Sequence, residues 1–447
     1  MTHKLALAAA LSLSFAGLGA AQSTLEPEAA RLTAAQLLAR GHAQAAADIT
    51  DVLVLRDPKD STSLILNAHA RRTLGDNTRA RQAARQGWQT AERPVERFGA
   101  AMAMAQALSS DGAKTRAQFW LRRAAHVAPD APTRARAIRD YRYVSTTNPW
   151  SVNLSFSINP SDNVNGAPSD NTFVLGGLIF TNPAAIPISG VVLRQNTALR
   201  YNFGTTQTER NFVSLNWTES HTVFTDDDVP AGVNASEFAF RRVQAQIGRD
   251  FNTGPEAPRQ TLSLSFGRLW SANDPLADEV KVDWRQTYVQ PEQRLFSWNA
   301  ELGYSHRKDS NLRSGVTASL GSYWARPTAS GGRLSWNATL GRTDTDSRAL
   351  THTALTLGMQ YTFAKPVLGA TAQVALSAQA KQYDDPLYGP DPRADLGAVV
   401  STSLVFTDFD TYGFAPKLTL EARKTNSNVT RFETENFGLN MGFQSLF

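Results

Sequence analysis

Apolar and polar side chains alternate over most of the chain from residue 150 onward, and this alternation limits the possible folds more than any other feature. It is clearest in residues 294–306. The even positions carry Phe296, Trp298, Ala300, Leu302 and Tyr304, and the odd positions carry Ser297, Asn299, Glu301 and Gly303. A period of two is typical of a strand whose two faces meet different surroundings. Beyond the N-terminal segment no run of 18 uncharged apolar residues occurs, which excludes membrane-spanning helices. Only a closed barrel could then carry this region through a membrane.

Turn residues divide residues 147–447 into fourteen segments, each long enough to cross a membrane at a tilt. Barrels of bacterial outer membranes have an even number of antiparallel strands. We therefore predict a 14-stranded antiparallel transmembrane β-barrel; a soluble β-sandwich is the alternative. On segments 294–306, 350–363 and 431–446 the inward face is polar and weakly charged. The strands are predicted near residues 150–159, 191–203, 210–220, 236–249, 260–270, 279–290, 294–306, 312–324, 332–342, 350–363, 367–382, 394–407, 412–424 and 431–446.

An even strand number places both ends of the barrel chain on one side of the membrane. The connections then fall into two sets. Those at 160–190, 226–228 and 384–392 are expected outside the cell, and those at 291–293 and 364–366 are expected in the periplasm.

Residues 27–145 are rich in Ala, Leu, Arg and Gln, which favour helices. Gly41, Gly75 and Gly112 lie 34 and 37 residues apart, and prolines recur at a similar spacing. Such a period is typical of tetratricopeptide-like repeats, so residues 22–146 are predicted to be a helical repeat domain that holds a partner on its concave face. An irregular helical domain is the alternative. The region carries 19 Lys and Arg against 12 Asp and Glu. Its basic surface suits an acidic client or anionic lipid, but no motif indicates nucleic acid.

The first 21 residues have the form of a secretory signal peptide. Lys4 precedes an apolar run, and small Gly19 and Ala21 stand just before Gln22. The chain is therefore predicted to enter the periplasm of a Gram-negative bacterium. It contains no Cys, so an acylated N-terminal Cys and thiolate sites are excluded.

Residue patterns for catalysis, metal binding or cofactor binding are missing from the sequence. The seven His residues are scattered singly, and no nucleophile elbow or phosphate loop occurs in the mature chain. The pair Ser305-His306 and the run Asp226-Asp227-Asp228 are most simply a strand end and a solvated loop. We predict no enzyme activity, no metal and no cofactor.

The last predicted strand carries large apolar side chains two residues apart at Leu439, Met441 and Phe443, and the sequence ends in Phe447. This pattern resembles the terminal signal that the barrel assembly machinery of the outer membrane reads, although Ser445 departs from it. Phe443 and Phe447 are therefore predicted to be a barrel-assembly signal on the lipid face.

Short polar or turn-forming segments mark the ends of several predicted strands. They are Asn148-Pro149-Trp150, residues 162–167 with Asn163 and Asn165, Ile188-Ser189-Gly190, Arg393 with Asp395, Gly413-Phe414-Ala415-Pro416, Arg423, and Ser427-Asn428. With a helical domain before a 14-stranded barrel, they resemble the surface lipoprotein assembly modulators, the Slam family of outer-membrane translocators. The positions that match family motifs are Asn163, Asn165, Gly413, Phe414, Pro416, Ser427 and Asn428.

The resemblance implies that a monomeric barrel in outer-membrane lipid delivers an exported protein client, a surface lipoprotein or a secreted protein, to the cell surface. A polysaccharide exporter and a diffusion porin are the alternatives. The client itself is not identified by the sequence.

Overall fold

The computed structural model describes residues 26–169, 171–175, 178–181, 185–226, 229–254 and 257–447. The predicted signal peptide at residues 1–21 lies outside the described residues. The chain divides by its contacts into two compact units, the first ending at Gly112 and the second spanning Ala113–Phe447.

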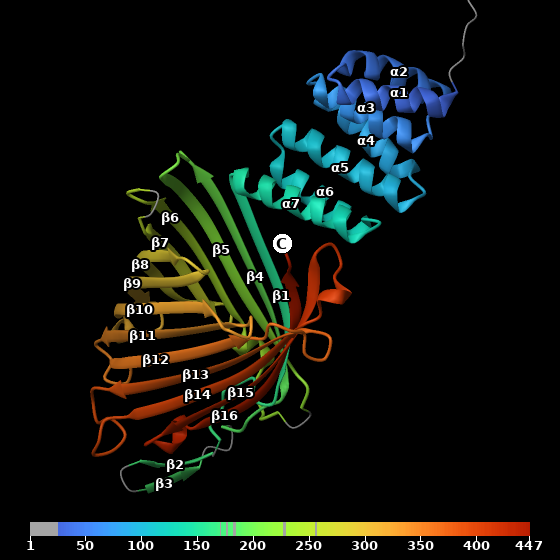
Figure 1. The fold of residues 1–447 in the computed structure, drawn as a ribbon. Coiled ribbons are helices and arrows are strands. Elements are labelled where there is room, and N and C mark those ends of the chain that lie inside the picture. The colour runs from blue at the N-terminus through green and yellow to red at the C-terminus, as the bar shows by residue number, and fades with distance from the viewer. Residues whose placement is uncertain (1–25, 170, 176–177, 182–184, 227–228, 255–256) are drawn as a thin grey trace, which may run out of the picture. The chain divides into compact units, whose positions relative to one another are not determined.

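The first unit contains five helices in its described part, and each packs against the next. Alanine dominates their contacts: Ala34, Ala46, Ala47 and Ala70 are fully buried, and side chains this small let helix backbones approach closely. Two of the predicted turn glycines, Gly41 and Gly75, have φ of 85° and 82°, a conformation that glycine adopts without strain. The helices, drawn in blue to cyan in Figure 1, are α1 (Pro27–Ala39), α2 (Ala43–Arg56), α3 (Ser61–Thr73), α4 (Asn77–Thr90) and α5 (Pro94–Ser110).

Two further helices, α6 (Lys114–Val127) and α7 (Ala131–Thr147), belong to the second unit. They pack on each other, and Lys114 Nζ donates to the carbonyl of Thr147 at 2.8 Å. The predicted N-terminal helical domain is thus confirmed, while its tetratricopeptide character stays a prediction. Helix gives way to strand between Thr147 and Trp150, and the boundary at residue 146 also stays a prediction. No helix in the described part of the chain is long and apolar enough to cross a membrane.

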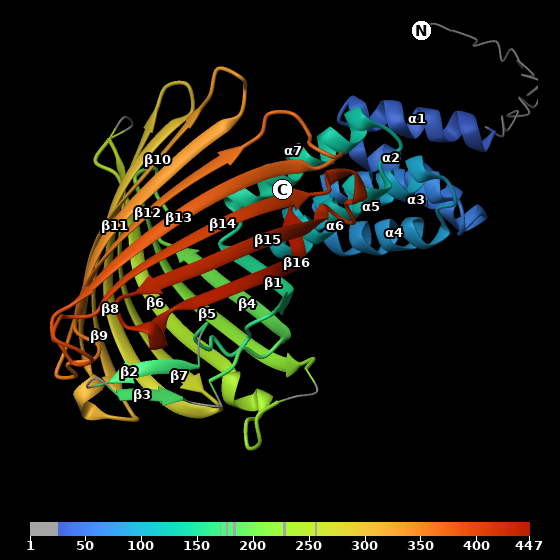
Figure 2. The same cartoon turned by 90° about the horizontal axis from the view of Figure 1, so that it is seen from below.

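Among the described residues, fourteen antiparallel strands close into a barrel, as predicted (Figures 1 and 2). Each strand pairs with its neighbours in sequence, and β1 closes the barrel on β16. The strands are β1 (Trp150–Ser161), β4 (Gly190–Phe203), β5 (Glu209–Phe224), β6 (Phe240–Phe251), β7 (Arg259–Ser271), β8 (Asp274–Gln290), β9 (Arg294–Arg307), β10 (Gly315–Pro327), β11 (Arg333–Thr345), β12 (His352–Thr362), β13 (Thr371–Tyr383), β14 (Ala394–Val405), β15 (Phe414–Ser427) and β16 (Thr434–Ser445).

The faces of the strands agree with the predicted alternation. On β9, Trp298, Leu302 and Tyr304 are 41%, 57% and 49% exposed, and they form part of an apolar outer wall. Ser297 on the opposite face is buried, and Glu301 pairs with Lys281 across the inner wall at 3.1 Å. An apolar outside and a polar inside are the arrangement of outer-membrane barrels.

The barrel has a proximal end, where β1 begins and β16 ends, and a distal end, where β1 ends. Connections near residues 160–190, 226 and 384–392 lie at the distal end, and those at 291–293 and 364–366 lie at the proximal end. A feature missed from the sequence is a two-stranded hairpin, β2 (Thr172–Leu175) and β3 (Leu178–Thr181), within the long distal connection.

Candidate functional site: the barrel interior and its two ends

Charged side chains line the interior mainly on β4 to β9. Asp250 accepts hydrogen bonds from Arg200 and Arg210, both at 2.6 Å, and from Thr261 at 2.9 Å. Arg242 pairs with Glu279 at 2.8 Å on the same wall. The prediction of a weakly charged inner face, made from segments 294–306, 350–363 and 431–446, missed this concentration. Ion pairs offset much of the charge, so the inner surface on these strands is polar and mixed in sign.

The Arg200 group is positioned by an aromatic side chain that itself needs a glycine. Arg200 stacks on Phe212 with 3.6 Å between the guanidinium carbon and the ring centre, and Phe212 is 2% exposed. Phe212 lies opposite Gly248 on β6. A Cβ at Gly248 would lie 2.4 Å from this ring. Only glycine therefore leaves room for the ring and the arginine above it.

At the proximal end, Arg122 of α6 binds the last residues of the chain. Its guanidinium donates to Tyr412 O at 3.1 Å, to Ser445 Oγ at 2.8 Å, and to the carbonyl of Phe447. The same group lies over the rings of Tyr141, Phe414 and Phe447, 4.5–4.8 Å from their centres. A guanidinium can combine hydrogen bonds in its plane with aromatic contacts on its faces. We call Arg122 with these partners the α6 clamp.

Gly413 completes the α6 clamp. It has φ of 77°, and a Cβ there would lie 2.4 Å from the Phe447 ring. Its amide donates to Asp410 at 3.0 Å, and Asp410 pairs with Arg134 of α7 at 2.7 Å. The connection between β14 and β15 is thereby attached to both α6 and α7.

At the distal end, two asparagines fasten the long connection between β1 and β4. Asn163 is 6% exposed; its side chain exchanges hydrogen bonds with the backbone of Ala167 and donates to the carbonyl of Glu435 on β16. Asn165 bonds the backbone of Ile186 and Ile188 at 2.8 and 3.0 Å. An Asn amide has both donors and an acceptor, so it can replace missing backbone partners in a loop.

A second group of hydrogen bonds at the distal end joins the connection before β14 to the connection after β15. Asn428 accepts from the amide of Ala394 at 2.8 Å and donates to the carbonyl of Pro392 at 3.0 Å. Beside it, Arg393 and Asp395 form a two-bond pair at 2.6 and 2.9 Å, and the Arg393 guanidinium lies 3.3 Å from the Phe432 ring centre. The base of the 384–393 connection is therefore fixed by side chains.

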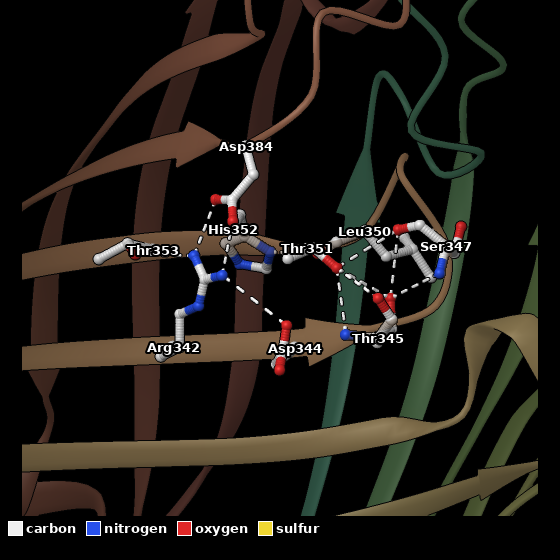
Figure 3. Close-up of polar contacts among 9 residues, drawn as sticks. All are labelled: Arg342, Asp344, Thr345, Ser347, Leu350, Thr351, His352, Thr353 and Asp384. Carbon is white, nitrogen blue, oxygen red and sulfur yellow. Dashed lines mark hydrogen bonds and ion pairs between the residues drawn. The ribbon is translucent and has the colours of Figure 1, made fainter.

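Figure 3 shows a third distal group, which joins β11, β12 and the residue after β13. Arg342 makes two hydrogen bonds to Asp384, at 2.7 and 2.5 Å, and a third to Thr353 at 3.3 Å. The hydrogen bond from Arg342 lowers the pKa of Asp384 from its ordinary value. Thr351, 7% exposed, donates to the carbonyl of Thr345 at 2.8 Å and closes the turn before β12.

The predicted motif residues thus fall into two groups. Asn163, Asn165, Ser427 and Asn428 lie at the distal end, and Gly413, Phe414 and Pro416 at the proximal end. Their functional role stays a prediction, as does the assembly signal. Phe443 lies on the outer face and is 64% exposed. The Phe447 ring lies against Gly413 and Tyr141, and Leu446 N donates to Gly413 O; the lipid-facing position of Phe447 stays a prediction.

Within the described ranges, no group of three or more His, Asp or Glu side chains could hold a metal ion. The arrangement offers a polar interior, two fastened ends and helices attached to one of them.

Comparison with protein families gives a match in the barrel. The matching residues, 284–438, run from β8 to β16. Residues 284–438 match the model of the surface lipoprotein assembly modifier family. The assembly-modifier match includes Gly413, Phe414, Pro416, Ser427 and Asn428, and it confirms the resemblance found in the sequence.

No curated protein matches the chain. Among solved structures, the Pseudomonas putida OprB structure at high pH is 8% identical and covers 70% of this chain and 96% of its own, with a TM-score of 0.39. A bacterial polysaccharide outer membrane secretin is 9% identical, covering 66% and 98%, with a TM-score of 0.34. The Yersinia enterocolitica type III secretion translocator chaperone SycD is 15% identical, covering 28% and 88%, with a TM-score of 0.25.

Proposed function

We propose that this protein is an outer-membrane translocator that delivers a protein client, either a surface lipoprotein or a secreted protein, from the periplasm to the cell surface. The observation that carries the proposal is the match of residues 284–438 to a family described by its action on surface lipoproteins. The closed barrel with an apolar outside supplies the membrane location. Its polar interior supplies a route for a polar chain.

The helices supply recognition in this proposal. Stacked helices offer an extended surface that suits a protein or peptide better than a small solute. The link from α7 to β1 is short, since only Asn148 and Pro149 separate them. Asn148 is also bonded to Thr115 and Gln118 of α6, at 3.1 and 2.8 Å. In this scheme the helical domain lies in the periplasm, the barrel acts as a monomer, and the barrel assembly machinery inserts it.

The test of function is surface delivery in a bacterial host that lacks the protein. Each exported protein encoded beside it is co-expressed with the full chain, or with a chain that keeps residues 1–25 and 113–447. The shortened chain retains the second compact unit with α6 and α7. We expect a neighbouring client to reach the surface, as judged by protease accessibility on whole cells, only with the full chain. Unchanged delivery of every candidate, with a loss of polysaccharide export or solute uptake on deletion, would replace this proposal with an exporter or porin.

The proposed orientation is tested with single cysteines, because the natural chain has none. Leu387→Cys at the distal end should react with a membrane-impermeant maleimide on intact cells, and Lys365→Cys at the proximal end should react only after lysis. Labelling of both positions on intact cells would contradict the orientation.

A further inference from the structure

The first half of β1 differs from the rest of the barrel in its exposure. Every residue from Trp150 to Phe156 is exposed on whichever face it lies, whereas Ser157–Ser161 are partly buried. Leu154 is 65% exposed, and Trp150, Val152 and Phe156 are 48–49% exposed. By comparison, β13 alternates between exposed and covered positions along its length. A strand exposed on both faces lacks a neighbour on one side.

The missing neighbour is β16. Within these fully described strands, β1 pairs with β4 at all twelve positions. It pairs with β16 only at Ser157–Gly442, Ile158–Met441 and Ser161–Gly438. We call the line between β1 and β16 the seam. The seam is therefore paired in its distal part and open in its proximal part.

The direction of the backbone groups follows from one bond. Asn202 N donates to Pro149 O at 2.8 Å, so odd-numbered residues of β1 bond to β4. In an antiparallel pair the bonding residues alternate, and the residues between them turn their N–H and C=O groups to the other side. Trp150, Val152 and Leu154 therefore direct these groups into the open part of the seam, and the Phe156 carbonyl lies beside Gly442 at its border.

The α6 clamp explains why β16 does not fill this space. Ser445 and Phe447 are bonded to Arg122, and Leu446 N donates to Gly413 O at 2.9 Å. These contacts hold the last residue of β16 and the two residues after it against α6 and the β14–β15 connection. The end of β16 is thus held by α6 instead of pairing with β1.

We propose that Trp150–Phe156 is a docking edge for one extended segment of the exported client, which adds to β1 as an antiparallel strand. Unpaired backbone groups at membrane depth are costly, and a strand added to an exposed edge satisfies them. The segment would continue the pairing line that β16 follows in the distal seam. It must be apolar on the outside, against Val152 and Leu154, and polar on the inside, against Ser151 and Asn153. The assignment of this segment to the exported client rests on the proposed function, whereas the exposed strand edge is observed without it.

The edge is tested with purified full-length protein in detergent micelles. The probe is a fluorescein-labelled synthetic peptide with the β16 sequence of residues 434–445, TENFGLNMGFQS, and binding is followed by anisotropy. A peptide of shuffled order with the alternation removed is the control. We expect the β16 peptide to bind at least about tenfold more tightly than the shuffled one. Equal binding of both peptides, or binding of neither, would overturn the proposal.

Two chain variants locate the binding. The double variant Val152→Pro and Leu154→Pro removes two N–H groups that face the seam and keeps the bonds to β4. It should bind the peptide about tenfold more weakly than the natural chain. The matched variant Val152→Ala and Leu154→Ala keeps both N–H groups and should lose less affinity. Heat-modifiable migration on gels establishes that each variant is folded. Equal affinities of the proline and alanine variants would refute docking through the backbone edge.

A photo-reactive residue tests the same docking without a proline substitution. With p-benzoylphenylalanine at position 154, illumination should join the peptide to the chain. The same residue at position 302, which is similarly exposed on β9, should give no product. Equal products at both positions would overturn the proposal, as would a dimer cross-linked through position 154, which would assign the edge to a second copy.

The cellular assay separates this inference from the proposed function. Specific peptide binding without client delivery would keep the edge and refute the translocator. Undiminished client delivery by a folded proline variant that no longer binds the peptide would keep the translocator and would refute docking of the client on this edge.

Discussion

Arg122→Ala should release the end of β16 and the β14–β15 connection from α6. The arginine makes three hydrogen bonds and contacts two aromatic rings there. Because all of its partners in the barrel lie in residues 412–447, the effect should be local.

The expected size of the effect follows from these contacts. A hydrogen bond contributes about 1 kcal/mol net, and a partly exposed cation–ring contact contributes about 0.5 kcal/mol. Their sum is roughly 4 kcal/mol, and coupling among contacts that share one group reduces it to about 3 kcal/mol. This corresponds to more than a hundredfold rise in the local opening equilibrium. Arg122→Lys keeps the charge but loses the planar set of donors. It should therefore reduce the free energy that holds this segment to α6 by about half as much as Arg122→Ala does.

Amide hydrogen exchange measures this opening directly. The reporters are the amides of Thr411, Phe414 and Leu446, whose backbone hydrogen bonds lie beside the clamp. Their protection should fall by about a hundredfold in Arg122→Ala. Arg116→Ala is the matched control, because Arg116 is exposed on the same helix. Unchanged protection in Arg122→Ala, or an equal loss in the control, would refute the assignment of the clamp to Arg122.

Three further substitutions have defined outcomes. Gly413→Ala should lower the thermal unfolding temperature, through a loss of about 1–3 kcal/mol, because a Cβ would meet Phe447 at a positive φ; an unchanged temperature would contradict the close contact. Asn428→Ala should expose the 384–393 connection to protease through a loss of about 1–2 kcal/mol, and an unchanged cleavage rate would contradict its fastening role. Burial raises the pKa of Asp60, but the hydrogen bonds from Ser63 and the ion pair with Arg31 outweigh it and leave the pKa lowered. The stabilisation that ionised Asp60 gives to the folded state is therefore present above about pH 4 and lost as the pH falls further. In Asp60→Asn, the free energy of unfolding, measured with urea and helical circular dichroism, should fall less steeply as the pH is lowered below about 4; an unchanged slope would contradict the linkage.

The strands could be predicted because the polarity of each side chain on a barrel wall depends on whether it faces outward or inward. β9 was predicted at 294–306 and spans Arg294–Arg307, since apolar Trp298 and polar Asn299 must face different solvents. The hairpin β2–β3 was missed because it lies in a long connection, where no membrane enforces alternation.

The contacts at the ends were beyond sequence reasoning for a different reason. Arg122 and Phe447 are 325 residues apart, and nothing in either local pattern indicates the other. Arg122 was grouped with the basic helix surface, and Phe447 was read as one more apolar residue of the final strand. The open seam was equally hidden, because β1 carries the same alternation as the strands that are fully paired.

The partial seam also bears on how the barrel forms. Every other strand pair of the wall joins consecutive strands of the barrel, but closing the seam brings together groups such as Asn159 and Asn440, 281 residues apart. Closing a loop of that length costs about 5 kcal/mol of chain entropy. Three backbone pairs offset only part of this, and side-chain bonds of the distal seam, such as those from Asn163 and Asn436, must supply the rest. We therefore expect ring closure to begin at the distal end, where the backbone pairs of the seam lie.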